Sequence, residues 1–171
     1  MKLGDGVEQA IHCVLLLSGL SQTGVLSAAA LAEFHGVSPS YLLKHLQAMA
    51  GAGLLVSVPG PKGGYRLAKP ADEITLLDVV LAVEGPQPAF RCAEIRQRGP
   101  SPVAKHFFKA PCAVNAAMLK AEKAYRAELK KVTIAELGNR GGSDLGRAIT
   151  TRSCAFFDLH ERNRSTAPAK E

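Results

Sequence analysis

One continuous stretch, residues 36–70, constrains the fold more than any other part of the chain: GVSPSYLLKHLQAMAGAGLLVSVPGPKGGYRLAKP. Gly36 is expected to end one helix, and Ser38 is a preferred residue for capping the next. Pro39 then occupies the first helical turn, where its missing N–H costs nothing. Apolar residues recur at helical spacing as far as Ala50, and glycines follow. The stretch therefore predicts a helix-turn-helix.

A β-hairpin is expected directly after this helix. Two short strands flank residues 59–64, whose sequence PGPKGG is rich in turn formers. A capped helix after a tight turn suits the DNA major groove, and a basic hairpin beside it suits contacts with the DNA backbone. The alternative is a small helical core with an ordinary hairpin. The candidates for reading bases are Ser38, Ser40, Tyr41 and Lys44. His45 is the candidate for a contact with phosphate. The candidates for contacts with the DNA backbone are Lys62 and Arg66, and Arg66 is able to reach the minor groove instead.

The charge distribution supports this interpretation locally. The whole chain carries a formal net charge of +6, yet residues 1–85 hold more acidic than basic side chains. Residues 36–70 contain no Asp or Glu, but they contain Lys44, Lys62, Arg66 and Lys69. Because phosphate attraction is screened within about 8–10 Å at ordinary salt, the local stripe matters more than the total. The expected partner is double-stranded DNA.

Composition divides the chain into further segments. Residues 1–85 form the expected winged helix-turn-helix domain, and residues 86–111 form a loop rich in Pro, Gly and charge. Residues 112–137 are rich in Ala, Lys, Glu and Leu, which predicts a long helix whose apolar stripe needs a partner. The best partner is the same helix of a second copy, giving a homodimer. The Gly-, Ser- and Arg-rich residues 138–171 are expected to form a flexible tail.

The fold class is therefore mainly α with a small β-wing. Helix start and stop signals define the expected helices. They span about residues 4–21, 28–35 after Ser27, 76–84 after Thr75, 112–132, and a short turn at 134–137 after Thr133. The longest apolar run, Cys13 to Leu17, is too short to cross a membrane, and the N-terminus has no cleavage pattern. We expect a cytoplasmic protein without membrane association.

Some residues outside the DNA-binding stretch could carry chemistry. Glu8 and His12 are four residues apart and project from one face of the first helix; their simplest role is a solvated pair. Cys92 and Cys112 lie in or beside the proline-rich loop, and cytosolic cysteines often bind metal or sense redox state. Cys13 falls in an apolar run and is expected in the core. Cys154 and the remaining histidines receive no role, although His106 is a spare ligand candidate. No nucleotide loop or nucleophile–base set occurs, so an enzyme is not expected.

Several segments resemble one family of bacterial regulators. LAEFHGVSPSYLLKHLQAMAGAGLL, GPKGGYRLAKPADEITLLDVVLAVEG and FRCAEIRQRGP are similar to the Rrf2 family of winged-helix transcription regulators. The resemblance covers about residues 1–137, and its wing signature at 63–67 is specific. It implies a homodimer, a long dimerisation helix after the cysteine loop, and a metal cluster held by that loop.

The loop departs from the family pattern because it has two cysteines where most cluster-binding members have three. It is similar instead to a two-cysteine redox-regulator branch, in which a histidine and a carboxylate from the first helix complete a 2Fe–2S site. The resemblance thus implies Glu8, His12, Cys92 and Cys112 as ligands. The resulting hypothesis is a transcriptional repressor that senses redox state or oxidative or nitrosative stress. Its alternatives are a thiol–disulfide or cluster-free regulator, and a zinc-stabilised interaction protein that binds no operator.

Overall fold

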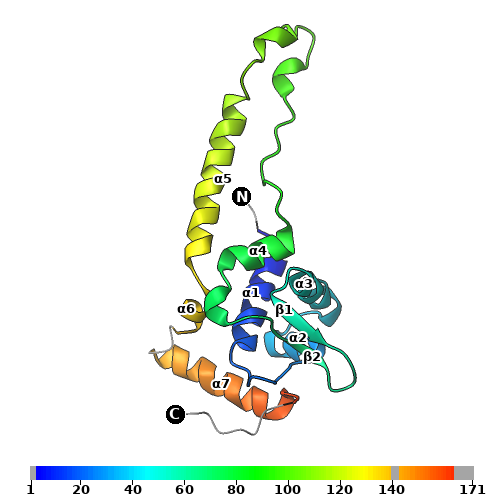
Figure 1. Ribbon diagram of the computed structural model, residues 1–171, viewed down its shortest axis with the longest axis vertical. Helices are drawn as coiled ribbons and strands as arrows, with labels where there is room; N and C mark the ends of the chain where they lie inside the picture. Colours follow the sequence, from blue (N-terminus) through cyan, green and yellow to red (C-terminus); the bar gives the residue numbers. More distant parts are fainter. Residues whose placement is uncertain (1–2, 140–142, 164–171) are drawn as a thin grey trace.

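The computed structural model describes residues 3–139 and 143–163, which form a helical body with a long stalk rising from it (Figure 1). In chain order the helices and strands are α1 (Asp5–Leu17), α2 (Ala28–His35), α3 (Pro39–Gly51), β1 (Leu55–Val58), β2 (Gly64–Leu67), α4 (Leu76–Glu84), α5 (Ala113–Lys131), α6 (Ile134–Gly138) and α7 (Asp144–His160). Short 3₁₀ turns occur at Ala71–Glu73, Ile95–Gln97 and Lys105–Phe107. The mainly α fold with a small β-wing is confirmed.

The helix-turn-helix forms where the capping residues predict it. The Ser27 hydroxyl accepts a hydrogen bond from the Ala30 N–H at 3.1 Å and starts α2. Gly36 ends α2 with φ of 65°, a left-handed conformation that glycine adopts without steric cost. Ser38 stands at the N-cap of α3, but its hydroxyl makes no capping bond and lies 3.1 Å from that of Ser40. Pro39 alone supplies the expected start signal.

The core lies where α1, α2, α3 and the wing converge. Fully buried side chains include Val14, Leu31, Leu42, Leu46, Met49, Ile74 and Ile134. Cys13 belongs to the same cluster and has no exposed surface, as expected from its apolar neighbours. Burial raises the pKa of its thiol to about 12, so Cys13 stays protonated. It acts as a small apolar core residue.

The wing is a two-stranded antiparallel hairpin that pairs Leu55 with Leu67 and Val58 with Gly64. Leu26, from the segment between α1 and α2, adds one rung by exchanging backbone hydrogen bonds of 3.1 and 2.8 Å with Tyr65. Tyr65 itself is buried against the core. The rung fixes the base of the wing to the body.

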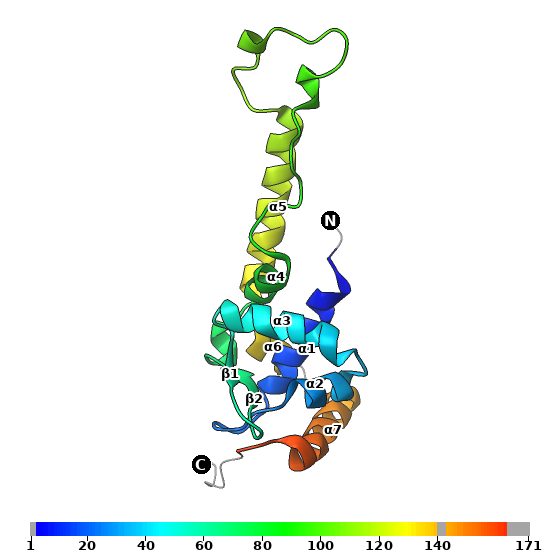
Figure 2. The same ribbon diagram turned by 90° about the vertical axis from the view of Figure 1, so that its right-hand side faces the viewer.

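The stalk leaves and re-enters the body at one point. Thr75 and Thr133 pair in a β-bridge, and each caps the helix that follows it with a capping box. Between them run α4, which packs against α1 and α3, then the long loop, and then α5, which rises away from the body (Figure 2). Among the described residues, no helix combines the length and apolarity needed to span a bilayer.

The C-terminal part differs from the expectation of a flexible tail. Residues 144–160 form α7, which begins at Ser143, whose hydroxyl accepts the Gly146 N–H at 3.1 Å. The helix lies across the base of the body (Figure 1). Phe157 enters the core with 6% of its surface exposed, and an added Cβ at Gly19 would lie only 3.0 Å from its ring. Aromatic burial therefore orders a segment whose glycines and arginines suggested mobility.

Candidate nucleic-acid interface and dithiol site

The exposed side of α3 carries the residues proposed to read bases. Ser38, Ser40, Tyr41 and Lys44 are all exposed, and Tyr41 has 46% of its surface open. On the wing, Lys62 is exposed at the tip and Arg66 is half-buried on β2. These side chains come from an acid-free stretch, so nothing within it neutralises their charge.

His45 corrects the expectation of a phosphate contact, because the structure buries it. Its ring has 7% of its surface exposed and lies edge-on to the Tyr41 ring at 4.8 Å between centroids. The helical positions of Leu42, His45 and Met49 place all of them on the buried side of α3. Burial, aided by Lys44, lowers the pKa of His45, while Glu84 opposes the shift. The neutral ring is therefore favoured, and it contributes packing.

The two loop cysteines lie together, beside a carboxylate that sequence reasoning overlooked. Ligand atoms of Cys92, Glu94 and Cys112 all lie within 4.8 Å of one another. Glu94 adopts a left-handed conformation with φ of 48° and forms an ion pair with Arg96. The spacing Cys92-Ala93-Glu94 was the available signal, since it places a carboxylate only two residues from the first thiol.

Cys112 has the environment of a reactive thiol. It is the N-cap residue of α5. The pKa of its thiol is lowered chiefly by the nearby backbone of Asn115, and further by the backbone of Val114, the Arg96 charge and the Cys92 thiol. Partial desolvation acts in the opposite direction but does not prevail. A thiolate at a helix N-terminus is a good nucleophile and a good metal ligand.

Within one chain, Glu8 and His12 do not meet the cysteines. Both are exposed on α1, in the body, whereas Cys112 stands at the start of α5 with Cys92 beside it, and α5 starts at its end away from the body (Figure 2). Glu8 and His12 line an open, mostly apolar hollow of about 360 Å³ together with Leu3, Val7 and Ile11. The structure thus presents one pair of predicted ligands in a surface hollow and the other pair on a loop.

A histidine absent from the predicted site lies next to His12. The His35 ring centroid is 6.0 Å from that of His12, and its buried Nε2 has no hydrogen-bond partner within the described part of the chain. Burial, followed by the charges of His12 and Arg152, lowers the pKa of His35 to about 4. His35 therefore remains neutral near pH 7.

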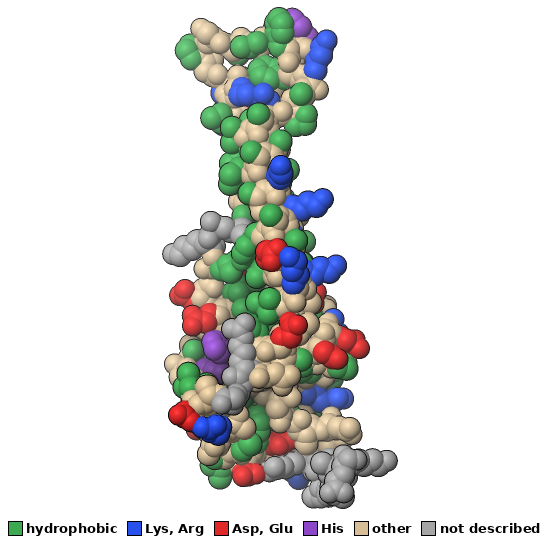
Figure 3. Space-filling view, turned by 90° about the vertical axis from the view of Figure 1, so that its left-hand side faces the viewer, with side chains coloured by type: hydrophobic (Ala, Val, Ile, Leu, Met, Phe, Trp, Pro, Cys, Tyr) green, Lys and Arg blue, Asp and Glu red, His purple; other side chains and the backbone are tan. Residues whose placement is uncertain are grey.

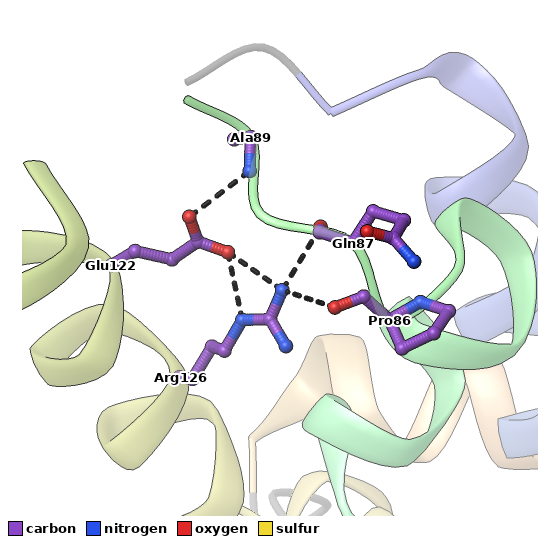
Figure 4. Close-up of polar contacts among 5 residues, drawn as sticks. All are labelled: Pro86, Gln87, Ala89, Glu122 and Arg126. Carbon is purple, nitrogen blue, oxygen red and sulfur yellow. Dashed lines mark hydrogen bonds and ion pairs between the residues drawn. The ribbon is translucent and has the colours of Figure 1, made fainter. Parts of the chain in front are cut away.

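The start of the loop is tied to the stalk by a polar network (Figure 4). The Arg126 guanidinium donates to the Glu122 carboxylate at 2.9 and 2.6 Å, and to the carbonyls of Pro86 and Gln87 at 3.1 Å each. Glu122 also accepts the Ala89 N–H at 3.0 Å. Movement of the loop would therefore be transmitted to α5 at this place.

The outer half of α5 exposes apolar side chains. Val114, Met118 and Leu119 are 60%, 44% and 40% exposed. Figure 3 shows hydrophobic side chains running up the stalk, with Lys and Arg along one edge. Single exposed apolar residues are ordinary, but a continuous stripe of this kind marks an interaction surface.

Comparison with known proteins gives the chain its family. The profile of Rrf2, described as an iron-dependent transcriptional regulator, matches residues 3–140. The HTH-type transcriptional regulator YffB of Lactococcus lactis is 34% identical over 142 residues, covering 81% of this chain and 88% of YffB. YwgB of Bacillus subtilis is 48% identical over 85 residues, covering 50% of this chain and 54% of YwgB. IscR of Photorhabdus laumondii is 37% identical over 92 residues, covering 54% of this chain and 56% of IscR.

Solved structures agree. The oxidized form of Staphylococcus aureus CymR is similar with a TM-score of 0.59 and 25% identity, covering 81% of this chain and 97% of CymR. T. potens IscR has the same fold, with a TM-score of 0.59 and 23% identity, covering 80% of this chain and 85% of T. potens IscR. The profile stops before α7. From Leu3 to the end of the stalk, this chain belongs to the Rrf2 family of transcriptional regulators.

Proposed function

We propose that the protein is a homodimeric, DNA-binding repressor that senses redox state through a 2Fe–2S cluster. Cys92 and Cys112 would hold the cluster, with Glu8 and His12 of the partner subunit completing its ligands. The observation that carries this proposal is the convergence of Cys92, Glu94 and Cys112 within 4.8 Å at the start of α5. The two-cysteine branch of the family supplies the expectation for the other two ligands.

The residues present suit such a group. Thiolates hold iron–sulfur clusters, and the lowered pKa of Cys112 favours the thiolate. When bound, the cluster would supply one-electron redox chemistry. His12 would coordinate as a neutral imidazole. Glu94 is a nearby carboxylate that could replace Glu8, and its ion pair with Arg96 would then have to open.

Dimer formation would bring the separated ligands together. The exposed stripe of α5 is the proposed contact between subunits, and the hollow around Glu8 and His12 would receive the partner's loop. Each loop would then link the DNA-binding body of one subunit to the stalk of the other. A shift of the loop, transmitted through Arg126 and Glu122, would change the spacing of the two recognition helices.

DNA recognition would use α3 and the wing together. Ser38, Ser40, Tyr41 and Lys44 would meet base edges in the major groove, and Lys62 and Arg66 would contact the backbone. Replacing Lys62 by Ala should weaken binding to all DNA sequences alike. It should also make the plot of log K against the logarithm of the salt concentration less steep by about one unit. An unchanged slope would remove the wing tip from the interface.

A reversible disulfide is the second candidate, favoured by the closeness of the two thiols. Hydrogen peroxide could oxidise both thiols, forming one S–S bond and two waters, with the Cys112 thiolate attacking first. The similarity to an oxidized form of CymR is compatible with thiol-based regulation. This mechanism would need no ligand from α1.

Anaerobic purification followed by absorption spectroscopy and metal analysis separates the candidates. A bound cluster gives coloured protein with about two irons per subunit, whereas the disulfide switch gives colourless, metal-free protein. Zinc in colourless protein that binds no operator would support an interaction protein instead. Cys92→Ala and Cys112→Ala should abolish the colour, while His12→Ala should leave a labile cluster. Cys13→Ala and Cys154→Ala are the matched controls and should retain it.

A further inference from the structure

The chain after α7 returns to the base of the wing. The backbone N–H and C=O of Arg162 pair with those of Val25, both at 3.0 Å. The Glu161 carboxylate accepts the Ser21 N–H at 2.9 Å and the Ser21 hydroxyl at 2.5 Å. Since Leu26 pairs with Tyr65 of β2, the segment 25–26 lies between the wing and the C-terminal residues. The end of the described chain thus extends the backbone pairing that supports the wing.

Side chains from this segment also bind the wing tip. The Arg162 guanidinium donates to the carbonyls of Pro61 at 2.9 Å and Gly63 at 3.2 Å. The Asn163 amide donates to the carbonyl between them, that of Lys62, at 3.3 Å. Three successive carbonyls of the tip are therefore bound by two neighbouring side chains. We call Glu161, Arg162 and Asn163 the C-terminal clasp.

The wing needs such support. Each of its strands has four residues, and an isolated two-stranded hairpin of that size is marginally stable in water. Within the tip, the Gly63 N–H donates to the Gly60 carbonyl at 2.9 Å, which closes the turn without tying it to the body. The clasp supplies contacts between the tip and the body from residues beyond the stretch matched by the family profile.

We propose that Arg162 is a positioning residue for DNA binding, holding the wing tip, and with it Lys62, in place. The inference rests on the DNA-binding role proposed above for Lys62. Two carbonyls of the tip accept from the same guanidinium nitrogen of Arg162, so this side chain acts on the tip, where the exposed Lys62 is the proposed phosphate contact. A tip already held in place loses less conformational freedom on binding, which strengthens the complex.

The test uses the full chain with Arg162→Ala and the milder Arg162→Lys, which keeps the charge but loses the planar fork. Arg147→Ala is the control, because it removes the same charge from the opposite end of α7. The first readout is amide exchange at Gly63, which should be about tenfold faster in Arg162→Ala than in the wild type. The second is affinity for a fluorescent mixed-sequence duplex, which should fall about five- to tenfold. Arg162→Lys should give a smaller change of the same sign in both readouts.

A double-mutant cycle with Lys62→Ala distinguishes positioning from direct contact. If Arg162 acts through Lys62, adding Arg162→Ala to Lys62→Ala should cost little further affinity. Additive losses with unchanged Gly63 exchange would mean that Arg162 contacts DNA itself and would overturn the proposal. Equal exchange in wild type and Arg162→Ala would also overturn it. If the wild-type protein binds no duplex, while amide exchange at Gly63 is still faster in Arg162→Ala than in the wild type, the DNA-binding function is refuted but the role of the clasp in holding the wing tip is supported.

Discussion

A Cβ atom added at Gly6 would lie 2.4 Å from Cε1 and Nε2 of His45, so the backbone of α1 touches a ring of the recognition helix α3. Gly6→Ala should therefore force α1 and α3 apart. Overpacking of this kind typically costs about 1–3 kcal/mol of unfolding free energy. We expect a lower urea midpoint, together with weaker duplex binding because α3 is displaced.

Gly51→Ala is the matched control for that substitution. Gly51 is the last residue of α3, and an added Cβ there meets no atom of residues 3–139 or 143–163 within 4 Å. Alanine favours the helix over glycine by up to about 1 kcal/mol, so this variant should be as stable as the wild type or slightly more so. Equal destabilisation by both alanines would show that the contact between Gly6 and His45 is unimportant.

Acid should destabilise the protein through its buried histidines. Burial is the first cause of the lowered pKa at both His35, where it falls to about 4, and His45. Below about pH 6.5 the unfolded chain binds protons that the folded rings do not, so stability falls as pH falls. The loss of unfolding free energy due to His35 is complete near pH 4 and amounts to at most about 3 kcal/mol. Solvent screening reduces this value, because the ring is partly exposed. His35→Gln should reduce the difference in urea midpoint between about pH 7 and pH 4.5.

The free thiols should differ in reactivity toward iodoacetamide near neutral pH. Cys112 should react readily, because its pKa is lowered and it is only half-buried. Cys13 should react last, since its pKa is about 12 and it is buried, so its alkylation requires unfolding. Mass spectrometry of peptides after increasing times measures both rates, and urea should abolish the difference at Cys13. Alkylation of Cys13 in native protein as rapid as that of exposed Cys154 would contradict this order.

Charge placed on the exposed stripe of α5 should separate the dimer. Met118→Glu puts a carboxylate where the proposed partner helix packs, and desolvating an unpaired charge is costly. Sedimentation should show monomers and lost operator binding. Lys120→Glu is the control, because residues two apart on a helix point in nearly opposite directions. A wild-type protein that is monomeric at micromolar concentration would refute the proposed interface.

Local signals predicted most of the helices and the wing. Thr75 and Thr133 form the expected capping boxes, and Gly36 ends α2 as expected. The error at His45 concerns tertiary structure. Its spacing from Leu42 and Met49 matched the buried side of α3, but a titratable ring is usually exposed. The crossing of α1 at Gly6 helps to bury it, and no local pattern encodes a helix crossing.

The C-terminal helix was missed for a different reason. Its sequence mixes polar and apolar residues, and Leu145, Ile149 and Leu159 are exposed, so they give no clear apolar face. Its order depends on Phe157 entering the core and on the contacts of Glu161 and Arg162 with distant residues. The cluster of Cys92, Glu94 and Cys112 likewise depends on how a long loop closes, which spacing alone does not determine.

The bridge between Thr75 and Thr133 has a consequence for how such proteins can diversify. Because Thr75 and Thr133 pair, α5 returns to the body at the residue where α4 begins, so the two ends of this segment stay together. The helix α4 packs against α1 and α3 and belongs to the body, whereas the loop and the outer part of α5 rise away from it. This outer part could therefore be lengthened, shortened or replaced while α4 keeps α1 and α3 in position.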